Sequence, residues 1–237
     1  MPLPRILVFT PIYNAKNYSL NEFIEHAKAM TYKNKDHIFI DNSETKDYSI
    51  ALKRRLQPLG FKIYHIERGS NSREAIARTQ MFARNKAITG NYDYLFSLES
   101  DIMVPPDILE QLLKHGKDVI TALYYIGDRS KGQRVPCITL PDYNKYLNAF
   151  GTRLLSPEEW NQYKNQGLKR VQAGGFGTCL IYKRIFHKFN FYYDPRFQGH
   201  SDIYFFNELF MNRIPVFVDT DIICEHKNSN WEDVEDR

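Results

Sequence analysis

The chain has 237 residues, of which 43% are hydrophobic and 25% are charged. These fractions are ordinary for a globular protein and exclude a disordered chain, a collagen-like repeat and a bundle of membrane helices. Lysine and arginine total 32 against 28 aspartate and glutamate, a formal net charge of +4 that suits a negatively charged ligand without establishing a nucleic-acid binder. Aromatic residues make up 14% of the chain, which is an unusual share.

The sequence shows no feature that would place the chain in a membrane. No apolar run approaches the ~20 residues of a spanning helix, and residues 1–5 do not resemble the start of a secretory signal. Cys137, Cys179 and Cys224 are odd in number and widely spaced, so they indicate neither a disulfide framework nor a metal knuckle. We therefore expect a cytoplasmic protein without stable membrane insertion, whose thiols are reduced.

Short apolar runs alternate with helical patterns through the first half of the chain. Strands are predicted at residues 6–10, 37–40, 61–66, 94–98 and 119–125, and helices at 20–30, 48–56, 72–88 and 106–115. This alternation is typical of an α/β fold with a parallel sheet covered by helices on both faces. An apolar segment at 176–182, a helix at 203–212 and a strand at 216–218 are predicted further on.

The alternation breaks between residues 127 and 170. This stretch is polar and contains Pro136, Pro141 and Pro157, which predicts a long functional loop or an inserted hairpin. The tail at 228–237 is polar and is expected to be loose. No linker divides the chain, so a single domain over residues 1–237 is predicted.

Polar side chains follow three of the predicted strands. Ligands of open α/β sheets bind outside the carboxyl ends of the strands, so these side chains are expected to meet at one site, although each group alone would be an ordinary turn. They are Thr10, Tyr13 and Asn14 after the first strand, Asp41, Asn42 and Ser43 after the second, and Glu99, Ser100 and Asp101 after the fourth.

Glu99 and Asp101 are two carboxylates that follow a buried strand at a spacing of two residues. Mg²⁺ usually takes one or two carboxylates together with substrate phosphates, and the imidazole of His226 would add a good ligand for Mn²⁺. The two acids could instead cap the helix that starts near Pro106. Alone, His226 is a weak signal, because most histidines do not bind metal.

Three other features have both a functional and a structural interpretation. The glycine-dense segment 174–177 either lets the backbone approach a ligand or marks a bulge at a strand start. Asp202 either caps a helix or takes a proton from a substrate hydroxyl. Arg73, Arg78 and Arg84 lie on one predicted helix, where they either bind phosphate oxygens or form a solvated face.

The order of these motifs resembles the nucleotide-sugar-dependent glycosyltransferases of the GT-A fold, most closely family 2, over residues 6–226. Two positions depart from the family pattern: Glu99 replaces the first acid of the D-x-D metal motif, and Ser201 replaces the Glu of an E-D pair, which leaves Asp202 as the candidate base there. The matching segments are Thr10 to Asn14 for a T-x-x-x-N turn, Asp41 for the acid after the second strand, Ala83-Arg84-Asn85 for A-R-N, Glu99-Ser100-Asp101 for D-x-D, residues 173–177 for a glycine-rich strand start, Ser201-Asp202 for E-D, and His226 for a terminal His.

The resemblance implies a GT-A, Rossmann-like fold with a mixed, mostly parallel sheet and helices on both faces. Residues 1–125 would bind the nucleotide sugar, and residues 126–237 would bind the acceptor and carry the catalytic base. The implied reaction moves a sugar from a nucleoside diphosphate sugar, with a UDP-sugar expected, to a hydroxyl of a saccharide or glycoconjugate, with inversion.

The resemblance also assigns roles to individual residues. Asp202 would be the catalytic base, and Asp101 and His226 would bind Mn²⁺ or Mg²⁺, with Glu99 acting through a metal-bound water or facing the ribose. The residues expected to bind the donor are Thr10, Tyr13, Asn14, Asp41, Arg78, Arg84, Glu99, Ser100, Gly174 and Gly175.

Other functions stay open at this point. Certain phage enzymes of the same fold glycosylate a hydroxylated base in DNA, and cations interleaved with aromatic residues would suit such an acceptor. A nucleotidyltransferase is disfavoured because Pro11 to Asn14 replaces its glycine-rich loop, and the altered acids leave room for a non-catalytic nucleotide-sugar-binding module. The residues that favour DNA are Arg129, Lys131, Arg134, Lys145, Arg153, Lys164, Lys169 and Arg170, with Tyr143, Tyr146 and Trp160.

Overall fold

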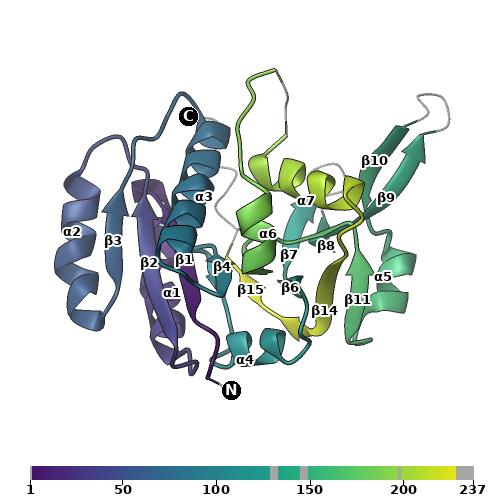
Figure 1. Ribbon diagram of the computed structural model, residues 1–237, viewed down its shortest axis with the longest axis horizontal. Helices are drawn as coiled ribbons and strands as arrows, with labels where there is room; N and C mark the ends of the chain where they lie inside the picture. Colours follow the sequence, from purple (N-terminus) through teal and green to yellow (C-terminus); the bar gives the residue numbers. More distant parts are fainter. Residues whose placement is uncertain (1, 129–132, 145–148, 197–198, 228–237) are drawn as a thin grey trace.

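The structure is a computed structural model that describes residues 2–128, 133–144, 149–196 and 199–227. Its centre is an eight-stranded sheet made of β1 (Ile6–Ile12), β2 (Lys35–Asp41), β3 (Lys62–His65), β4 (Tyr94–Leu98), β6 (Val119–Leu123), β11 (Leu168–Val171), β13 (Thr178–Tyr182) and β14 (Val216–Ile223). The strand order is β11-β14-β6-β13-β4-β1-β2-β3 (Figure 1).

The sheet is mixed and mostly parallel. Strand β1 runs parallel to β2 and β4, β2 runs parallel to β3, and β6 runs parallel to β14. Strand β13 runs antiparallel to both β4 and β6, and β11 runs antiparallel to β14. The predicted fold class is therefore confirmed, with β13 inserted against the direction of its neighbours.

Helices cover both faces of the sheet. Successive residues of β1 point to opposite faces, so Val8 packs in one core cluster with Phe23, whereas Phe9 packs in a second with Phe205. Such strands are buried on both sides, which explains why they read as continuous apolar runs. The first cluster is covered by α1 (Asn17–Ala29), α2 (Asp47–Leu56) and α4 (Ile108–Leu113), and the second by α3 (Ser72–Thr89), α6 (Lys183–Lys188) and α7 (Ser201–Met211).

The strands and helices predicted for the first half are present with small shifts at their ends. Strand β4 has the predicted bounds, whereas β1 continues through Pro11 to Ile12. Beyond Phe9, β1 pairs with β2 but no longer with β4, so the missing N–H of Pro11 is tolerated at this position. Among the described residues, no helix is both long and apolar enough to cross a membrane.

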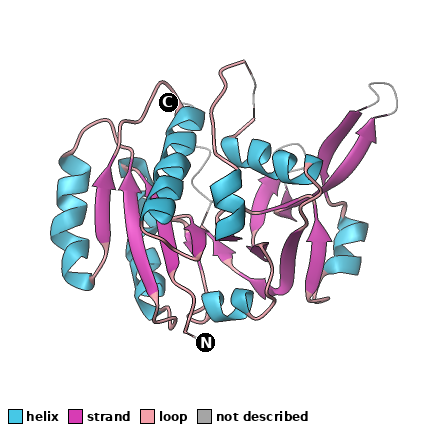
Figure 2. Cartoon of the chain, in the orientation of Figure 1, coloured by secondary structure: helices cyan, strands magenta, loops and turns pink. Residues whose placement is uncertain are grey.

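The stretch predicted as a long loop or inserted hairpin contains regular structure. Strand β7 (Tyr125–Asp128) pairs with β8 (Gln133–Pro136), and β9 (Ile138–Asn144) pairs with β10 (Ala149–Leu154) and β12 (Ala173–Gly174). The β9–β10 ribbon projects from the body of the molecule (Figure 2). Helix α5 (Pro157–Tyr163) follows, started by a capping box between Ser156 and Glu159. Arg129, Lys131, Lys145, Tyr146 and the tail 228–237 lie outside the described residues.

Candidate functional site

A segment from the end of the chain lies against the turn that follows β4. Strand β15 (Glu225–His226) pairs antiparallel with β5 (Ile102–Met103), which places His226 opposite Ile102. The backbone N–H of Lys227 also donates to the carbonyl of Asp101 at 2.8 Å. These backbone contacts hold His226 beside Glu99 and Asp101, although more than half of the chain separates them.

Glu99, Asp101 and His226 form a compact cluster of possible metal ligands. One ligand atom from each residue lies within 4.8 Å of the others. Asp101 is fully buried, His226 is 9% exposed, and Nε2 of His226 lies 3.6 Å from Oδ2 of Asp101. Two carboxylates and an imidazole form a donor set that suits Mn²⁺ or Mg²⁺.

The backbone sets the orientation of the His226 ring. Its Nδ1 lies 3.1 Å from the carbonyl oxygen of Tyr125 in β7. A carbonyl can accept but not donate, so Nδ1 carries the proton, and Nε2 faces Asp101 with its lone pair whenever the ring is neutral. Burial opposes a charged imidazolium, but the carboxylates of Asp101 and Glu99 outweigh it and raise the pKa of His226.

Two side chains from the start of α1 reach Asp101, and neither was anticipated from the sequence. Nζ of Lys16 lies 2.9 Å from Oδ2 of Asp101, and the hydroxyl of Tyr18 donates to the same oxygen at 3.2 Å. Burial alone would raise the pKa of Asp101, but Lys16 and His226 together hold it well below its ordinary value. The same burial, reinforced by the charge of Asp101, raises the pKa of Glu99.

Asp202 lies in the first turn of α7, close enough to Glu99 for its charge to raise the pKa of that residue. Its Oδ1 accepts a hydrogen bond from the backbone N–H of Ile203 at 2.9 Å. Enclosure by the protein raises the pKa of Asp202, against the lowering effect of His200. The preceding Ser201 is buried, and its hydroxyl donates to the Gln80 side chain, which ties α7 to α3.

The glycine-dense segment packs against β6 and the residue after it. A Cβ at Gly174 would lie 2.1 Å from Oγ1 of Thr121, and a Cβ at Gly175 would lie 2.2 Å from Cε1 of Tyr124. The Tyr124 hydroxyl accepts a hydrogen bond from the N–H of Gly177 at 3.2 Å, and its ring meets the His226 ring edge-on at a centroid distance of 5.2 Å. The close contacts with Thr121 and Tyr124 leave no room for a side chain at positions 174 and 175, which explains the glycines there.

Replacing Gly175 by alanine should therefore destabilise the protein. The new methyl group would displace the buried Tyr124 ring, and overpacking of this kind costs about 1–3 kcal/mol in the free energy of unfolding. The matched control is Gly127→Ala, where a Cβ meets nothing within 4 Å. Urea unfolding, monitored by circular dichroism, measures the stability of both variants. Equal midpoints for the two variants would show that the segment accommodates a side chain.

The polar residues after β1 and β2 divide between the core and the rim of the site. Thr10 is fully buried, and its Oγ1 lies 2.8 Å from Nε2 of the buried His37, inside the sheet. Asp41 is also buried; one of its oxygens accepts from the N–H of Ser43 at 2.9 Å and the other lies 3.0 Å from Nδ1 of His65. In this conformation neither side chain is exposed to a ligand.

Tyr13 and Asn14 are the more accessible members of this group. The guanidinium of Arg68 lies over the ring of Tyr13, 4.8 Å from its centroid, and reaches Oδ1 of Asn42 at 3.4 Å. Asn14 is exposed, and its N–H donates to the Ser43 hydroxyl at 3.0 Å. Arg68 had no recognisable signal in the sequence, because it follows β3 in a segment without a motif.

Ser100, Arg84 and Arg78, which the sequence predicts to bind the donor, contact other parts of the protein in this structure. Ser100 is buried, its carbonyl accepts from the Ser19 hydroxyl at 3.0 Å, and its own hydroxyl has no hydrogen-bond partner among the described residues. Arg84 donates to the carbonyls of Phe189 at 2.9 Å and His187 at 3.2 Å, which closes the end of α6. These contacts do not support a role for Arg84 in binding the donor.

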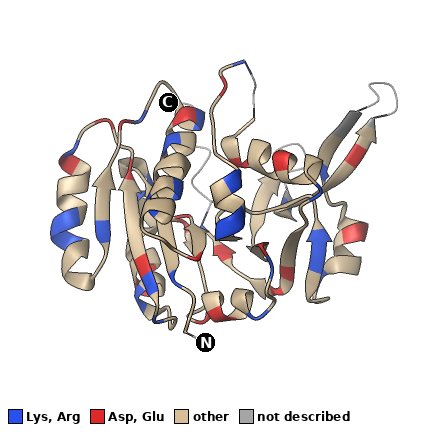
Figure 3. Cartoon of the chain, viewed as in Figure 1, with Lys and Arg blue, Asp and Glu red and all other residues tan. Residues whose placement is uncertain are grey.

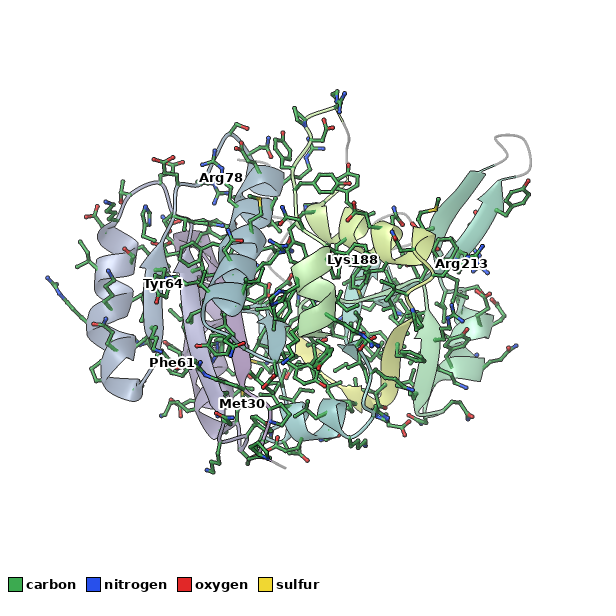
Figure 4. The ribbon with its side chains drawn as sticks, viewed as in Figure 1. Met30, Phe61, Tyr64, Arg78, Lys188 and Arg213 are labelled. Carbon is green, nitrogen blue, oxygen red and sulfur yellow. The ribbon has the colours of Figure 1, made fainter. Side chains whose placement is uncertain are left out.

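Arg78 lies near the upper end of α3 (Figure 4), where it forms an ion pair with Glu74 at 2.7 Å. Two of the cations proposed to bind DNA are engaged within the protein. Arg153 forms an ion pair with Glu159 at 2.6 Å, and Arg134 donates to the carbonyl of His226 at 2.9 Å. Lysine and arginine are spread over elements as distant as α2, α6 and β11 (Figure 3).

Comparison with known proteins assigns the chain to a family. A model described as "Glycosyl transferase family 2" matches residues 7–191. The chain belongs to glycosyl transferase family 2. The prediction of a family 2 glycosyltransferase is thereby confirmed, while no curated protein sequence matches the chain.

Solved structures agree with this family 2 assignment at the level of the fold. GalNAc-T7 with UDP, GalNAc and Mn²⁺ matches with a TM-score of 0.61 and 13% identity, over 94% of this chain and 43% of that one. A mannosyltransferase from Pyrobaculum calidifontis with GDP-Man and Mn²⁺ matches with a TM-score of 0.61 and 14% identity, over 94% of this chain and 56% of that one. The family 2 chain thus spans about half the length of these structures, and the predicted GT-A fold is confirmed.

Proposed function

We propose that this family 2 protein transfers a sugar from a nucleoside diphosphate sugar to an acceptor hydroxyl, with a divalent cation and with inversion. The observation that carries the proposal is the cluster of Glu99, Asp101 and His226, with the carboxylate of Asp202 within electrostatic reach of Glu99. The proposed metal ligands and the proposed base would therefore share one site at the carboxyl end of β4.

Asp101 and His226 would hold the cation, with Glu99 completing the cluster directly or through a water. Asp101 fits this role because its cationic neighbours hold its pKa low and so keep the carboxylate ionised. His226 fits because the Tyr125 carbonyl orients its Nε2 toward Asp101. When bound, the cation would neutralise negative charge on the leaving diphosphate. Mn²⁺ accompanies both structural neighbours, and we propose Mn²⁺ or Mg²⁺ here.

Asp202 would be the base of the reaction. Its carboxylate would take the proton of the acceptor hydroxyl as that oxygen forms a bond to the anomeric carbon and the bond from this carbon to the diphosphate oxygen breaks. The nucleoside diphosphate leaves with the electron pair of the broken bond, and attack opposite to it inverts the anomeric carbon. A raised pKa makes Asp202 a stronger base than an exposed aspartate, which favours this role.

The donor is proposed to be a UDP-sugar bound near Tyr13 and Asn14. The aromatic ring of Tyr13 suits a nucleobase, and the guanidinium of Arg68 lies over it. The neighbours contain different nucleotides, UDP in one and GDP-Man in the other. UDP- and GDP-sugars should therefore be compared in the same assay.

The direct test is release of nucleoside diphosphate from several nucleotide sugars, with and without acceptor saccharides. We expect release that needs Mn²⁺ or Mg²⁺ and stops with excess chelator. Donor binding without release would instead indicate a non-catalytic binding module. Pyrophosphate release from a nucleoside triphosphate and a sugar phosphate would indicate a nucleotidyltransferase.

The acceptor is proposed to be a saccharide or glycoconjugate. Gel retardation of duplex DNA at increasing salt tests the alternative acceptor, because binding through phosphates weakens as salt rises. We expect no retarded band even at low salt, since Arg153 and Arg134 are engaged within the protein. Salt-sensitive retardation would favour a hydroxylated base in DNA instead.

A further inference from the structure

An ammonium group from the protein itself lies at the proposed metal cluster. The Lys16 side chain is 14% exposed and Asp101 is not exposed at all, and their charged atoms are 2.9 Å apart. The Asp101 oxygen in this ion pair is the one that lies 3.6 Å from Nε2 of His226. Lys16 therefore supplies a positive charge at the carboxylate that is proposed to bind the cation.

The backbone around Lys16 is tied to the turn that carries these acids. A short 3-10 turn, η1 (Asn14–Lys16), ends at Lys16, whose N–H donates to the carbonyl of Tyr13 at 2.9 Å. The Ser19 hydroxyl lies 3.0 Å from the carbonyl of Ser100 and 3.3 Å from that of Lys16, so it joins the start of α1 to the acidic turn. The position of the Lys16 backbone is thus fixed, while its four-carbon side chain can rotate.

We propose that Lys16 is a displaceable counterion, which neutralises Asp101 before the donor binds and moves to the donor's diphosphate when metal and donor bind together. This inference rests on the proposed metal-dependent function. A metal ion and an ammonium at the same carboxylate repel each other, and this repulsion is several-fold stronger in a partly buried site than in water. The diphosphate adds negative charge that attracts both cations. Once the donor binds, this attraction offsets the repulsion between the metal ion and the Lys16 ammonium.

The proposal predicts that Lys16 couples metal binding to nucleotide binding. Without nucleotide, Lys16 competes with the metal for Asp101 and lowers its affinity. With nucleotide, Lys16 pairs with the diphosphate and supports the bound state. Because coupling between two ligands is reciprocal, the metal must raise nucleotide affinity by the same factor.

The test measures Mn²⁺ binding to the full chain by electron paramagnetic resonance, with and without UDP or GDP. In Lys16→Gln, which keeps a hydrogen-bond donor but lacks the charge, Mn²⁺ alone should bind about tenfold tighter, a difference of about 1.4 kcal/mol. The gain in Mn²⁺ affinity on adding nucleotide should shrink by at least about tenfold. Lys28→Gln is the matched control, because Lys28 lies in α1, which directly follows Lys16, but pairs with Glu25 at 3.1 Å on an exposed surface.

Lys16→Met repeats the measurement with an uncharged side chain that cannot donate a hydrogen bond, and thermal melting checks that both variants are folded. Unchanged or weaker binding of Mn²⁺ alone by folded Lys16 variants would overturn the counterion role and leave the metal site intact. Failure of the unsubstituted protein to bind Mn²⁺ under any condition would overturn the metal assignment itself. The two proposals therefore fail on different measurements.

Discussion

Asp202→Asn should lower kcat for sugar transfer by about 10²–10⁴-fold, the contribution typical of a general base. Asparagine has nearly the same shape, and its Oδ1 can still accept the hydrogen bond from the N–H of Ile203. The amide cannot take the proton of an acceptor hydroxyl, so the chemical step is lost while the donor still binds. Steady-state transfer kinetics and calorimetric titration with UDP measure the two effects separately.

Glu208→Gln is the control for Asp202→Asn, because it neutralises another acid of α7 outside the ligand cluster. It should retain transfer activity close to that of the unsubstituted protein. Normal turnover by Asp202→Asn would remove Asp202 from the mechanism. A joint loss of UDP binding and turnover would assign Asp202 to donor binding instead.

Asp101→Asn should abolish metal binding and also weaken the fold. Removing one partner of a buried ion pair costs about 3–5 kcal/mol, because Lys16 would keep its charge in a site where its side chain is 14% exposed. Both the Mn²⁺ affinity and the free energy of unfolding are thus expected to fall. The loss of affinity must therefore be distinguished from a loss of folded protein. Mn²⁺ titration and urea unfolding on the same preparation give the two values.

His226→Gln provides this separation. It removes the imidazole ligand but leaves Lys16 paired with Asp101, so stability should change much less than in Asp101→Asn. Loss of a group that only supports a metal ligand commonly lowers metal affinity by about 10–100-fold. Loss of the His226 imidazole should therefore lower Mn²⁺ affinity by at least about tenfold, and transfer should fall in parallel at limiting Mn²⁺. Undiminished Mn²⁺ affinity in His226→Gln would exclude His226 as a ligand.

Much of the fold could be predicted because its signals are local. The strand at 94–98 has the predicted bounds, and helix α3 begins and ends within one residue of its predicted ends at 72 and 88. Periodicity of apolar residues reports which faces of each element are buried, and it needs no knowledge of distant contacts. The stretch at 127–170 lacked this signal, since its short strands are polar and partly exposed.

The orientation of the site side chains is less predictable than the fold, because neighbours along the chain do not determine where a side chain points. The sequence predicts Thr10 at a strand end, but β1 continues to Ile12 and leaves Thr10 inside the sheet beside His37. The sequence predicts the helix that carries Arg84, yet the packing of α6 against α3 directs the Arg84 guanidinium to the carbonyl of Phe189.

By itself, the sequence determined the α/β architecture, the two acids after β4 and the resemblance to family 2, because each depends on short-range order along the chain. The resemblance only implied that His226 joins those acids, and the tertiary structure brings them together, since this requires β15 to pair with β5. The tertiary structure also showed Lys16 and Tyr18 at Asp101, contacts that depend on the packing of α1 against the acidic turn. Side chains from distant segments meet only when the sheet forms, so contacts without a motif, such as those of Lys16 and Tyr18, can be recognised only in three dimensions.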